Sequence, residues 1–131
     1  IEAEAKDRKT FFVYGGTEVD DRESIRSITE KEKNTIIVAS YGTFSTGINI
    51  RNLHNIIFAS PSKSRVRNLQ SIGRGLRLGE KKEQATLFDI SDDFRIGKFT
   101  NITLKHFIER VKIYDDEKFN YKFYNIELKN E

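Results

Sequence analysis

Residues 55–77 read NIIFASPSKSRVRNLQSIGRGLR, and this stretch decides the fold class of the chain. It opens with a short apolar run, 55–59, that is rich in β-branched residues and has the length of a strand. A helical pattern follows it, with an apolar stripe formed by Val66, Leu69, Ile72 and Leu76. A buried strand followed directly by an amphipathic helix is the repeating unit of α/β proteins.

Three other apolar runs of strand length occur along the chain, at 10–14, 35–39 and 85–90. Runs without polar alternation are typical of strands buried on both faces, as in a parallel sheet. Helical patterns at 20–33 and 62–78 separate the strands. This alternation predicts an α/β fold with a parallel sheet, flanking helices and right-handed crossovers.

The last part of the chain has a different pattern, which predicts a domain over residues 1–98 and a C-terminal helix and tail over 99–131. Apolar residues at helical spacing predict a helix over 101–118, and 119–128 is predicted to be a short strand or an extended tail. The aromatic residues of this part could form a base-stacking platform. Packing on the domain is the favoured interpretation, because aromatic residues at helical or alternating spacing usually belong to a core.

Composition excludes several classes of site. The 131 residues contain no Cys, which excludes disulfides, Cys-ligated zinc, iron–sulfur clusters and a cysteine nucleophile. The two His, at 54 and 106, have no spaced partner, so we predict no metal site. The apolar runs are far shorter than the roughly 20 residues of a membrane span, and no signal peptide is visible. We therefore expect a cytoplasmic protein without a membrane partner, cut from a longer chain.

The net charge of the chain is only +3, but a strongly basic segment lies between Lys63 and Lys82. This segment contains seven Lys or Arg residues and a single acid, Glu80. A concentrated basic segment in a nearly balanced chain favours a phosphate-bearing partner, although many such runs are solvated helix faces.

The residues within the segment favour the phosphate interpretation. Gln70, Arg74 and Arg77 are spaced i, i+4, i+7 and share one face of a helix. Gly73 and Gly75 each lower helix propensity by about 1 kcal/mol, which suits a surface that another group approaches closely. Two guanidiniums and an amide on one face form a set of donors for phosphate oxygens.

Three motifs in this order carry a resemblance to superfamily 2 helicases. The spacing Gln70-x-x-Gly73-Arg74-x-x-Arg77 resembles their motif VI, residues 38–50 (VASYGTFSTGINI) resemble motif V, and residues 14–17 (YGGT) resemble the turn after motif IV. The resemblance covers residues 10–92 and is nearest to the phage UvsW-type recombination and repair DNA helicases. It implies a RecA-like fold, the second of two motor domains, truncated at its N-terminus.

The resemblance also implies an ATP site. Arg77 would be the arginine finger on the γ-phosphate, Arg74 its partner on the same phosphates, and Gln70 would orient them. Gly47 and Asn49 would lie near the nucleotide. Asn49 departs from the pattern, since many relatives carry Asp there; an amide can still hydrogen-bond a ribose hydroxyl, but it removes the negative charge.

A nucleic-acid strand would cross the same edge of the sheet. Ser40 and Thr43 would contact its backbone from the carboxyl end of a strand, where ligands of α/β sheets gather. The turn of Gly15, Gly16 and Thr17 would offer amides and a hydroxyl to another phosphate.

Two features of the sequence also have an interpretation without a ligand. The turn at 15–17 could simply lead into a helix capped by Thr17 or Asp20. Asp92 and Asp93 could suggest a metal pair, but a helix cap or loop is the favoured interpretation.

The chain lacks the G-x-x-x-x-G-K-[ST] loop and the D-E-x-[DH] strand that superfamily 2 helicases use for ATP and Mg²⁺. The resemblance places them on an N-terminal RecA-like domain, which would hold the metal and be the partner of this chain. We therefore expect no ATP hydrolysis by the chain alone. Single-stranded or branched DNA is the implied substrate. The alternatives are a non-enzymatic nucleic-acid-binding module and the motor of a restriction enzyme.

Overall fold

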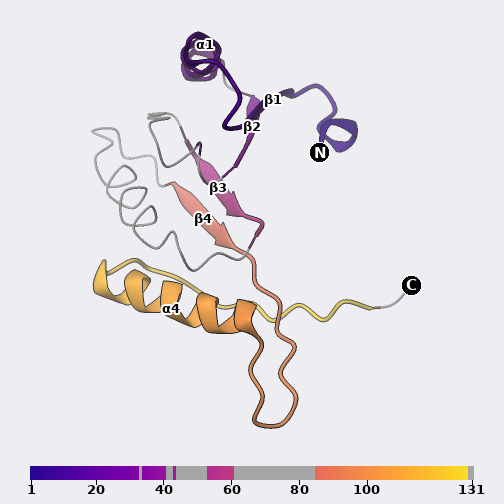
Figure 1. Ribbon diagram of the computed structural model, residues 1–131, viewed down its shortest axis with the longest axis vertical. Coiled ribbons are helices and arrows are strands. Elements are labelled where there is room, and N and C mark those ends of the chain that lie inside the picture. The colour runs from indigo at the N-terminus through magenta and orange to yellow at the C-terminus, as the bar shows by residue number, and fades with distance from the viewer. Residues whose placement is uncertain (33, 41–42, 44–52, 61–84, 130–131) are drawn as a thin grey trace.

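The computed structural model describes residues 1–32, 34–40, 43, 53–60 and 85–129 (Figure 1). The elements in these ranges are a 3₁₀ turn at Glu2–Glu4, β1 (Lys9–Val13), α1 (Val19–Lys31), β2 (Thr35–Ala39), β3 (Asn55–Phe58), β4 (Thr86–Asp89) and α4 (Ile102–Asp116). All four strands and the helices predicted at 20–33 and 101–118 are confirmed, with ends that differ by at most two residues. The helix predicted at 62–78 lies outside the described residues.

The strands form two parallel pairs. β1 pairs with β2 in a register that joins Lys9 to Thr35 and Val13 to Ala39. β3 pairs with β4, starting from Asn55 opposite Thr86. Figure 1 shows α1, the β1–β2 pair, the β3–β4 pair and α4 following one another along the long axis of the molecule. The prediction of an α/β fold with parallel strands is confirmed.

The strands are not buried on both faces, and that prediction is wrong. Val13 is fully buried, whereas its neighbour Phe12 is 64% exposed. Ile57 in β3 and Phe88 in β4 are also exposed, at 62% and 51%. Because successive side chains of a strand point to opposite faces, the alternating burial of β3 and β4 means that this pair packs through one face, whereas the residues of β2 are all half-buried. The continuous apolar runs therefore leave aromatic and aliphatic side chains at the surface.

A hydrophobic core cluster lies between the β3–β4 pair and α4. Its buried members are Ile56, Phe58 and Tyr114, and it is completed by the half-buried Leu53, Leu87, Val111 and Phe119. These residues come from both strands, from α4 and from the segment after it. The C-terminal helix is therefore packed on the sheet.

A buried ion pair joins α4 to the end of β4. The Arg110 guanidinium donates from Nε and Nη2 to the two oxygens of Asp89, both at 2.7 Å. The Tyr114 hydroxyl donates to the same carboxylate at 2.5 Å. Burial, and then the hydrogen bond to Asp89, raise the pKa of Tyr114 well above its usual range. The Tyr114 hydroxyl therefore stays a proton donor to Asp89.

The chain reverses direction at the end of α4. Lys118 has a left-handed backbone, with φ of 56°. The Phe119 amide donates to the Tyr114 carbonyl and the Lys118 amide to the Asp115 carbonyl, which is a Schellman motif with Lys in the position that Gly usually takes. Of the two forms predicted for 119–128, the structure shows the extended tail. The tail returns along α4, where Phe123 packs edge-on against Phe107 at 5.9 Å between centroids.

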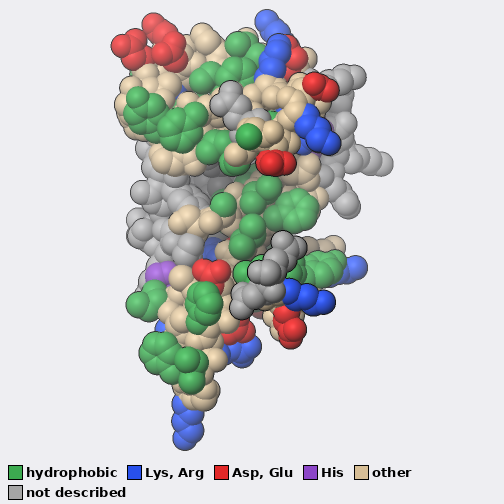
Figure 2. Space-filling model, turned by 90° about the vertical axis from the view of Figure 1, so that its right-hand side faces the viewer, with side chains coloured by type: hydrophobic (Ala, Val, Ile, Leu, Met, Phe, Trp, Pro, Cys, Tyr) green, Lys and Arg blue, Asp and Glu red, His purple; other side chains and the backbone are tan. Residues whose placement is uncertain are grey.

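The segment between β4 and α4 projects from the rest of the molecule (Figure 1). It is a narrow turn closed by mutual backbone hydrogen bonds between Ile96 and Phe99, with Gly97 in a left-handed conformation, at φ of 57°. Apolar side chains gather on this end of the molecule in Figure 2, and Phe94, Ile96 and Phe99 are each at least 65% exposed. No helix in the described part of the chain is long and apolar enough to cross a membrane.

The Asp89–Arg110 pair gives a first prediction. We expect Asp89→Ala to lower the free energy of unfolding by about 3–5 kcal/mol, because it leaves the Arg110 charge buried without its carboxylate. Urea unfolding of the purified chain, followed by circular dichroism, measures this change.

The matched control is Asp93→Ala. Asp93 pairs with Arg95 on the surface, where the Arg95 side chain is 60% exposed, so Asp93→Ala should change the free energy of unfolding far less than Asp89→Ala does. Equal effects of the two variants would contradict a stabilising role for the buried pair.

Candidate nucleic-acid interface

The candidate interface lies at the carboxyl ends of β1 and β2. Ser40 continues the pairing of the two strands, since its amide donates to the Val13 carbonyl at 3.2 Å. The turn 14–17 follows β1 at the same edge. The structure therefore brings together two groups of predicted site residues, the turn glycines with Thr17 and the Ser40–Thr43 pair, from positions about 25 residues apart in the sequence.

The turn after β1 is closed by two hydrogen bonds between Tyr14 and Thr17. The Thr17 amide donates to the Tyr14 carbonyl at 3.0 Å, and the Tyr14 amide donates to Thr17 Oγ1 at 3.1 Å. Because Oγ1 accepts a hydrogen bond here, its own hydrogen remains available as a donor. Thr17 thus closes the turn and keeps one hydroxyl donor for a ligand.

Arg22, in the first part of α1, fixes the other side of the turn. Its guanidinium donates from Nε to the Thr17 carbonyl at 2.9 Å and from Nη2 to the Gly15 carbonyl at 3.1 Å. In a trans peptide the carbonyl and the following N–H point in opposite directions. The Gly16 and Glu18 amides therefore point away from Arg22, as an anion-binding turn requires.

No motif in the sequence pointed to Arg22. Its spacing could have indicated the contact, because an Arg five residues after the turn threonine can reach the backbone carbonyls of the turn. Arg22 is thus a positioning residue for the turn.

The N-cap residue of α1 differs from the one that was predicted. The N-cap is Glu18, and its side chain makes no capping hydrogen bond, so the prediction of Thr17 or Asp20 as cap is wrong. The reason is that Thr17 Oγ1 is already bound to the Tyr14 amide. Asp20 and Asp21 lie in the first turn of α1 and offset the positive end of the helix dipole. An anion at this edge would therefore be bound by the turn rather than by the helix end.

Ser40 and Thr43 form a hydroxyl pair. Their side-chain oxygens lie 2.8 Å apart, and the Thr43 amide donates to the Ser40 carbonyl at 3.1 Å. Ser40 is exposed, whereas Thr43 is only 3% exposed. Ser40 is therefore the member that can meet a ligand, and Thr43 holds the Ser40 side chain in place.

Five predicted site residues lie outside the described residues: Gly47, Asn49, Gln70, Arg74 and Arg77. Their roles stay predictions. Asp92 and Asp93 lie in the projecting loop, where Asp93 accepts hydrogen bonds from the Arg95 guanidinium at 2.5–3.0 Å. These bonds lower the pKa of the Asp93 carboxyl.

The tail aromatics are held by α4 and by one another. The Tyr121 hydroxyl donates to Asp115 at 2.6 Å, and its ring packs against Tyr114 and Phe123. Tyr124 is 79% exposed. Tyr121 therefore fits the interpretation that the tail aromatics pack on the domain. The alternative, a base-stacking role, depends on closeness to the motif V loop, which lies outside the described residues.

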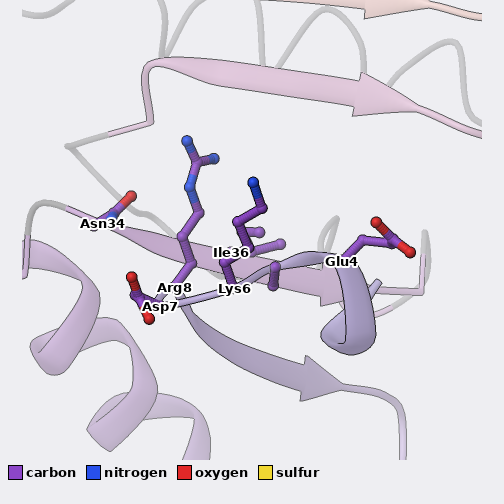
Figure 3. Close-up of a pocket in the computed structure, with 7 residues that line it drawn as sticks. Glu4, Lys6, Asp7, Arg8, Asn34 and Ile36 are labelled. Atoms are coloured by element: carbon purple, nitrogen blue, oxygen red, sulfur yellow. The ribbon is translucent and has the colours of Figure 1, made fainter.

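A hollow of about 410 Å³ lies at the opposite end of the β1–β2 pair (Figure 3). It is lined by the segment before β1 and by the start of β2: Glu4, Ala5, Lys6, Asp7, Arg8, Asn34 and Ile36. Figure 3 shows Lys6 and Arg8 projecting to the same side, with Asp7 and Glu4 beside them. Its charges balance and it lies at the amino ends of the strands, so it is separate from the candidate interface.

The chain matches the family described as Helicase conserved C-terminal domain over residues 2–79. This range includes the turn after β1, the Ser40–Thr43 pair and the arginine motif at 70–77. The chain therefore belongs to this family, and its fold is the RecA-like α/β fold of a superfamily 2 helicase C-terminal domain.

Among curated proteins, the chain is similar to the ATP-dependent DNA helicase uvsW of Enterobacteria phage T4. The two are 39% identical over 130 residues, which cover 92% of this chain and 26% of the relative. It is also 32% identical to the protein IRC3 of Saccharomyces cerevisiae over 97 residues, or 72% of this chain and 14% of the relative. The chain thus spans about a quarter or less of these relatives. No solved structure gave a significant match.

The Arg22 contacts give a second prediction. We expect Arg22→Ala to lower the free energy of unfolding by about 2 kcal/mol and to speed hydrogen exchange at the Thr17 amide, because two hydrogen bonds from a charged group are lost. Exchange measured by NMR reports the turn directly.

Arg26→Ala is the matched control on the same helix. Arg26 pairs with Glu23 at 2.5 Å within one helical turn, and such pairs contribute about 0.2–0.5 kcal/mol. Unchanged exchange at Thr17 in Arg22→Ala would contradict the positioning role.

Proposed function

We propose that this chain is the second motor domain of an ATP-dependent DNA helicase or translocase. The observation that carries the proposal is the family match over 2–79, which contains all three motifs in the order expected of such a domain. The arrangement of the turn and the hydroxyl pair at one sheet edge supports it, because ligands of α/β sheets gather at carboxyl ends.

In this proposal the ATP site is shared with a first RecA-like domain. Arg77 acts as the arginine finger that stabilises charge on the γ-phosphate, Arg74 binds the same phosphates, and Gln70 orients them. Gly47 and Asn49 lie near the nucleotide. This set offers cationic and amide donors, which suit a triphosphate. It offers no carboxylate for Mg²⁺, so the metal belongs to the first domain.

The nucleic-acid strand is proposed to lie across the carboxyl ends of β1 and β2. One phosphate meets the Gly16 and Glu18 amides and the Thr17 hydroxyl, in the turn that Arg22 fixes. Another part of the backbone meets Ser40, whose hydroxyl Thr43 holds. Contacts of this kind fix the position of a strand without reading its sequence.

The substrate class is proposed from similarity. The phage T4 relative is named a DNA helicase, and the resemblance of this chain to recombination and repair helicases points to single-stranded and branched DNA. Fold and motif alone do not select a substrate, so this part of the proposal depends on the activity test that follows.

The test uses the full protein that carries this chain and its Arg77→Ala variant. We expect DNA-stimulated ATP hydrolysis to fall by about 10³-fold or more in the variant, because the finger stabilises charge only during phosphoryl transfer. Affinity for single-stranded DNA should stay nearly unchanged. Steady-state ATPase assays with single-stranded and branched DNA measure the first effect, and fluorescence anisotropy measures the second.

Arg95→Ala is the control, since Arg95 lies on the projecting loop and pairs with Asp93. It should leave hydrolysis unchanged. DNA binding without any hydrolysis by the wild-type protein would contradict the motor and favour a non-enzymatic binding module.

The turn gives a prediction of its own. We expect Thr17→Val to weaken binding of single-stranded DNA about tenfold, because it removes one hydrogen bond to a charged phosphate and the acceptor that closes the turn. The salt dependence of binding should keep its slope, because no cationic phosphate contact is lost.

Thr17→Ser keeps the hydroxyl and should restore affinity to within about twofold. Wild-type affinity in Thr17→Val would remove Thr17 from the interface. Anisotropy titrations at several salt concentrations measure both the affinity and the slope.

A further inference from the structure

Two aromatic rings lie exposed beside the turn. Phe12 and Tyr14 are alternate residues at the end of β1, and their side chains are 64% and 51% exposed. Their rings are stacked, with centroids 5.5 Å apart and planes at 22°. The residue between them, Val13, is fully buried on the other face. The exposed face of β1 thus ends in a preformed aromatic stack.

The Tyr14 ring is in direct contact with the turn. A Cβ added at Gly16 would lie 2.6 Å from Tyr14 Cε2 and 3.4 Å from both neighbouring ring carbons. These distances fit an approach along the ring plane, toward the ring edge. Gly16 therefore lets the backbone of the turn close against the edge of the Tyr14 ring, while Tyr14 stays 51% exposed. At Gly15 the same added atom would meet nothing within 4 Å.

The surface therefore combines two chemistries within one short segment. The turn presents outward amides and the Thr17 hydroxyl, which suit a phosphate. The ring next to it presents a flat apolar face, which suits a base. A nucleotide in an unpaired strand carries these two groups a few ångströms apart, and stacking of a base on an aromatic side chain contributes about 1–3 kcal/mol.

We propose that Tyr14, supported from behind by Phe12, stacks on an unpaired base next to the phosphate bound by the turn. This inference rests on the proposed function, since it deepens the same interface. It adds a contact to the base, where the turn and Ser40 contact only the backbone. Every base has a flat face, so the contact is indifferent to sequence but requires a base that is not paired in a duplex.

The first experiment uses the full protein and single-stranded oligonucleotides. Tyr14→Leu should weaken binding about 5- to 100-fold, whereas Tyr14→Phe, which keeps the ring, should bind within about twofold of wild type. Tyr124→Leu is the matched control, because Tyr124 is also highly exposed but lies in the C-terminal tail. Equal losses in the two Leu variants would overturn the proposal.

A second measurement reports stacking itself. An oligonucleotide with abasic sites should bind the wild-type protein more weakly than the intact strand, while Tyr14→Leu should no longer distinguish the two. Fluorescence of 2-aminopurine placed along the strand should be quenched by wild type and Tyr14→Phe but less by Tyr14→Leu. Equal quenching by all three proteins would overturn the proposal.

The outcomes separate this inference from the proposed function. If the wild-type protein binds DNA and hydrolyses ATP but treats intact and abasic strands alike, the stack is covered by another part of the protein and the motor assignment stands. If the wild-type protein does not bind DNA, the proposed function fails and the stacking proposal fails with it.

Discussion

The in-register parallel pairing of β1 with β2 is the constraint on which the candidate interface depends. It sets Val13 opposite Ala39, and the next hydrogen bond, from the Ser40 amide to the Val13 carbonyl, brings the two following loops to one edge. Antiparallel pairing would place these loops at opposite ends of the strands. A shift of one residue would also move Val13 from its buried position and bury Phe12 or Tyr14 instead. The exposed stack and the turn thus depend on the same register.

Local patterns predicted the strands and two helices well because each apolar run is short and bounded by polar or turn residues. The pattern could not decide which faces would be covered, since burial depends on what packs against each sheet. This is why Phe12, Ile57 and Phe88 were expected in a core and are exposed. The strand pattern correctly placed the turn and the Ser40–Thr43 pair at one edge, because residues that follow parallel strands meet there. Their role in binding stays a prediction.

The sequence patterns could not predict side-chain contacts between residues that are far apart in the chain. Asp89 and Arg110 are 21 residues apart and belong to no recognised motif, yet they form the buried link between β4 and α4. Arg22 was missed because its guanidinium donates to backbone carbonyls. Every residue carries a carbonyl, so no sequence motif marks such a contact. Thr43 was expected to meet nucleic acid, but it is only 3% exposed and its hydroxyl lies 2.8 Å from that of Ser40. Short sequence patterns do not specify such a contact.

The candidate interface has an unusual distribution of charge for the nucleic-acid-binding role that is proposed for it. Among the described residues, the donors proposed to meet the strand at the edge of β1 and β2 are neutral amides and hydroxyls, and the first turn of α1 carries Asp20 and Asp21. The basic residues are concentrated at 63–82, in the segment that the proposal assigns to the nucleotide. Neutral hydrogen bonds release no counterions and hold a phosphate less tightly than guanidiniums do. If the proposed function holds, neutral contacts along the strand suit a motor that must release it in each cycle, and arginines suit the charge of a triphosphate.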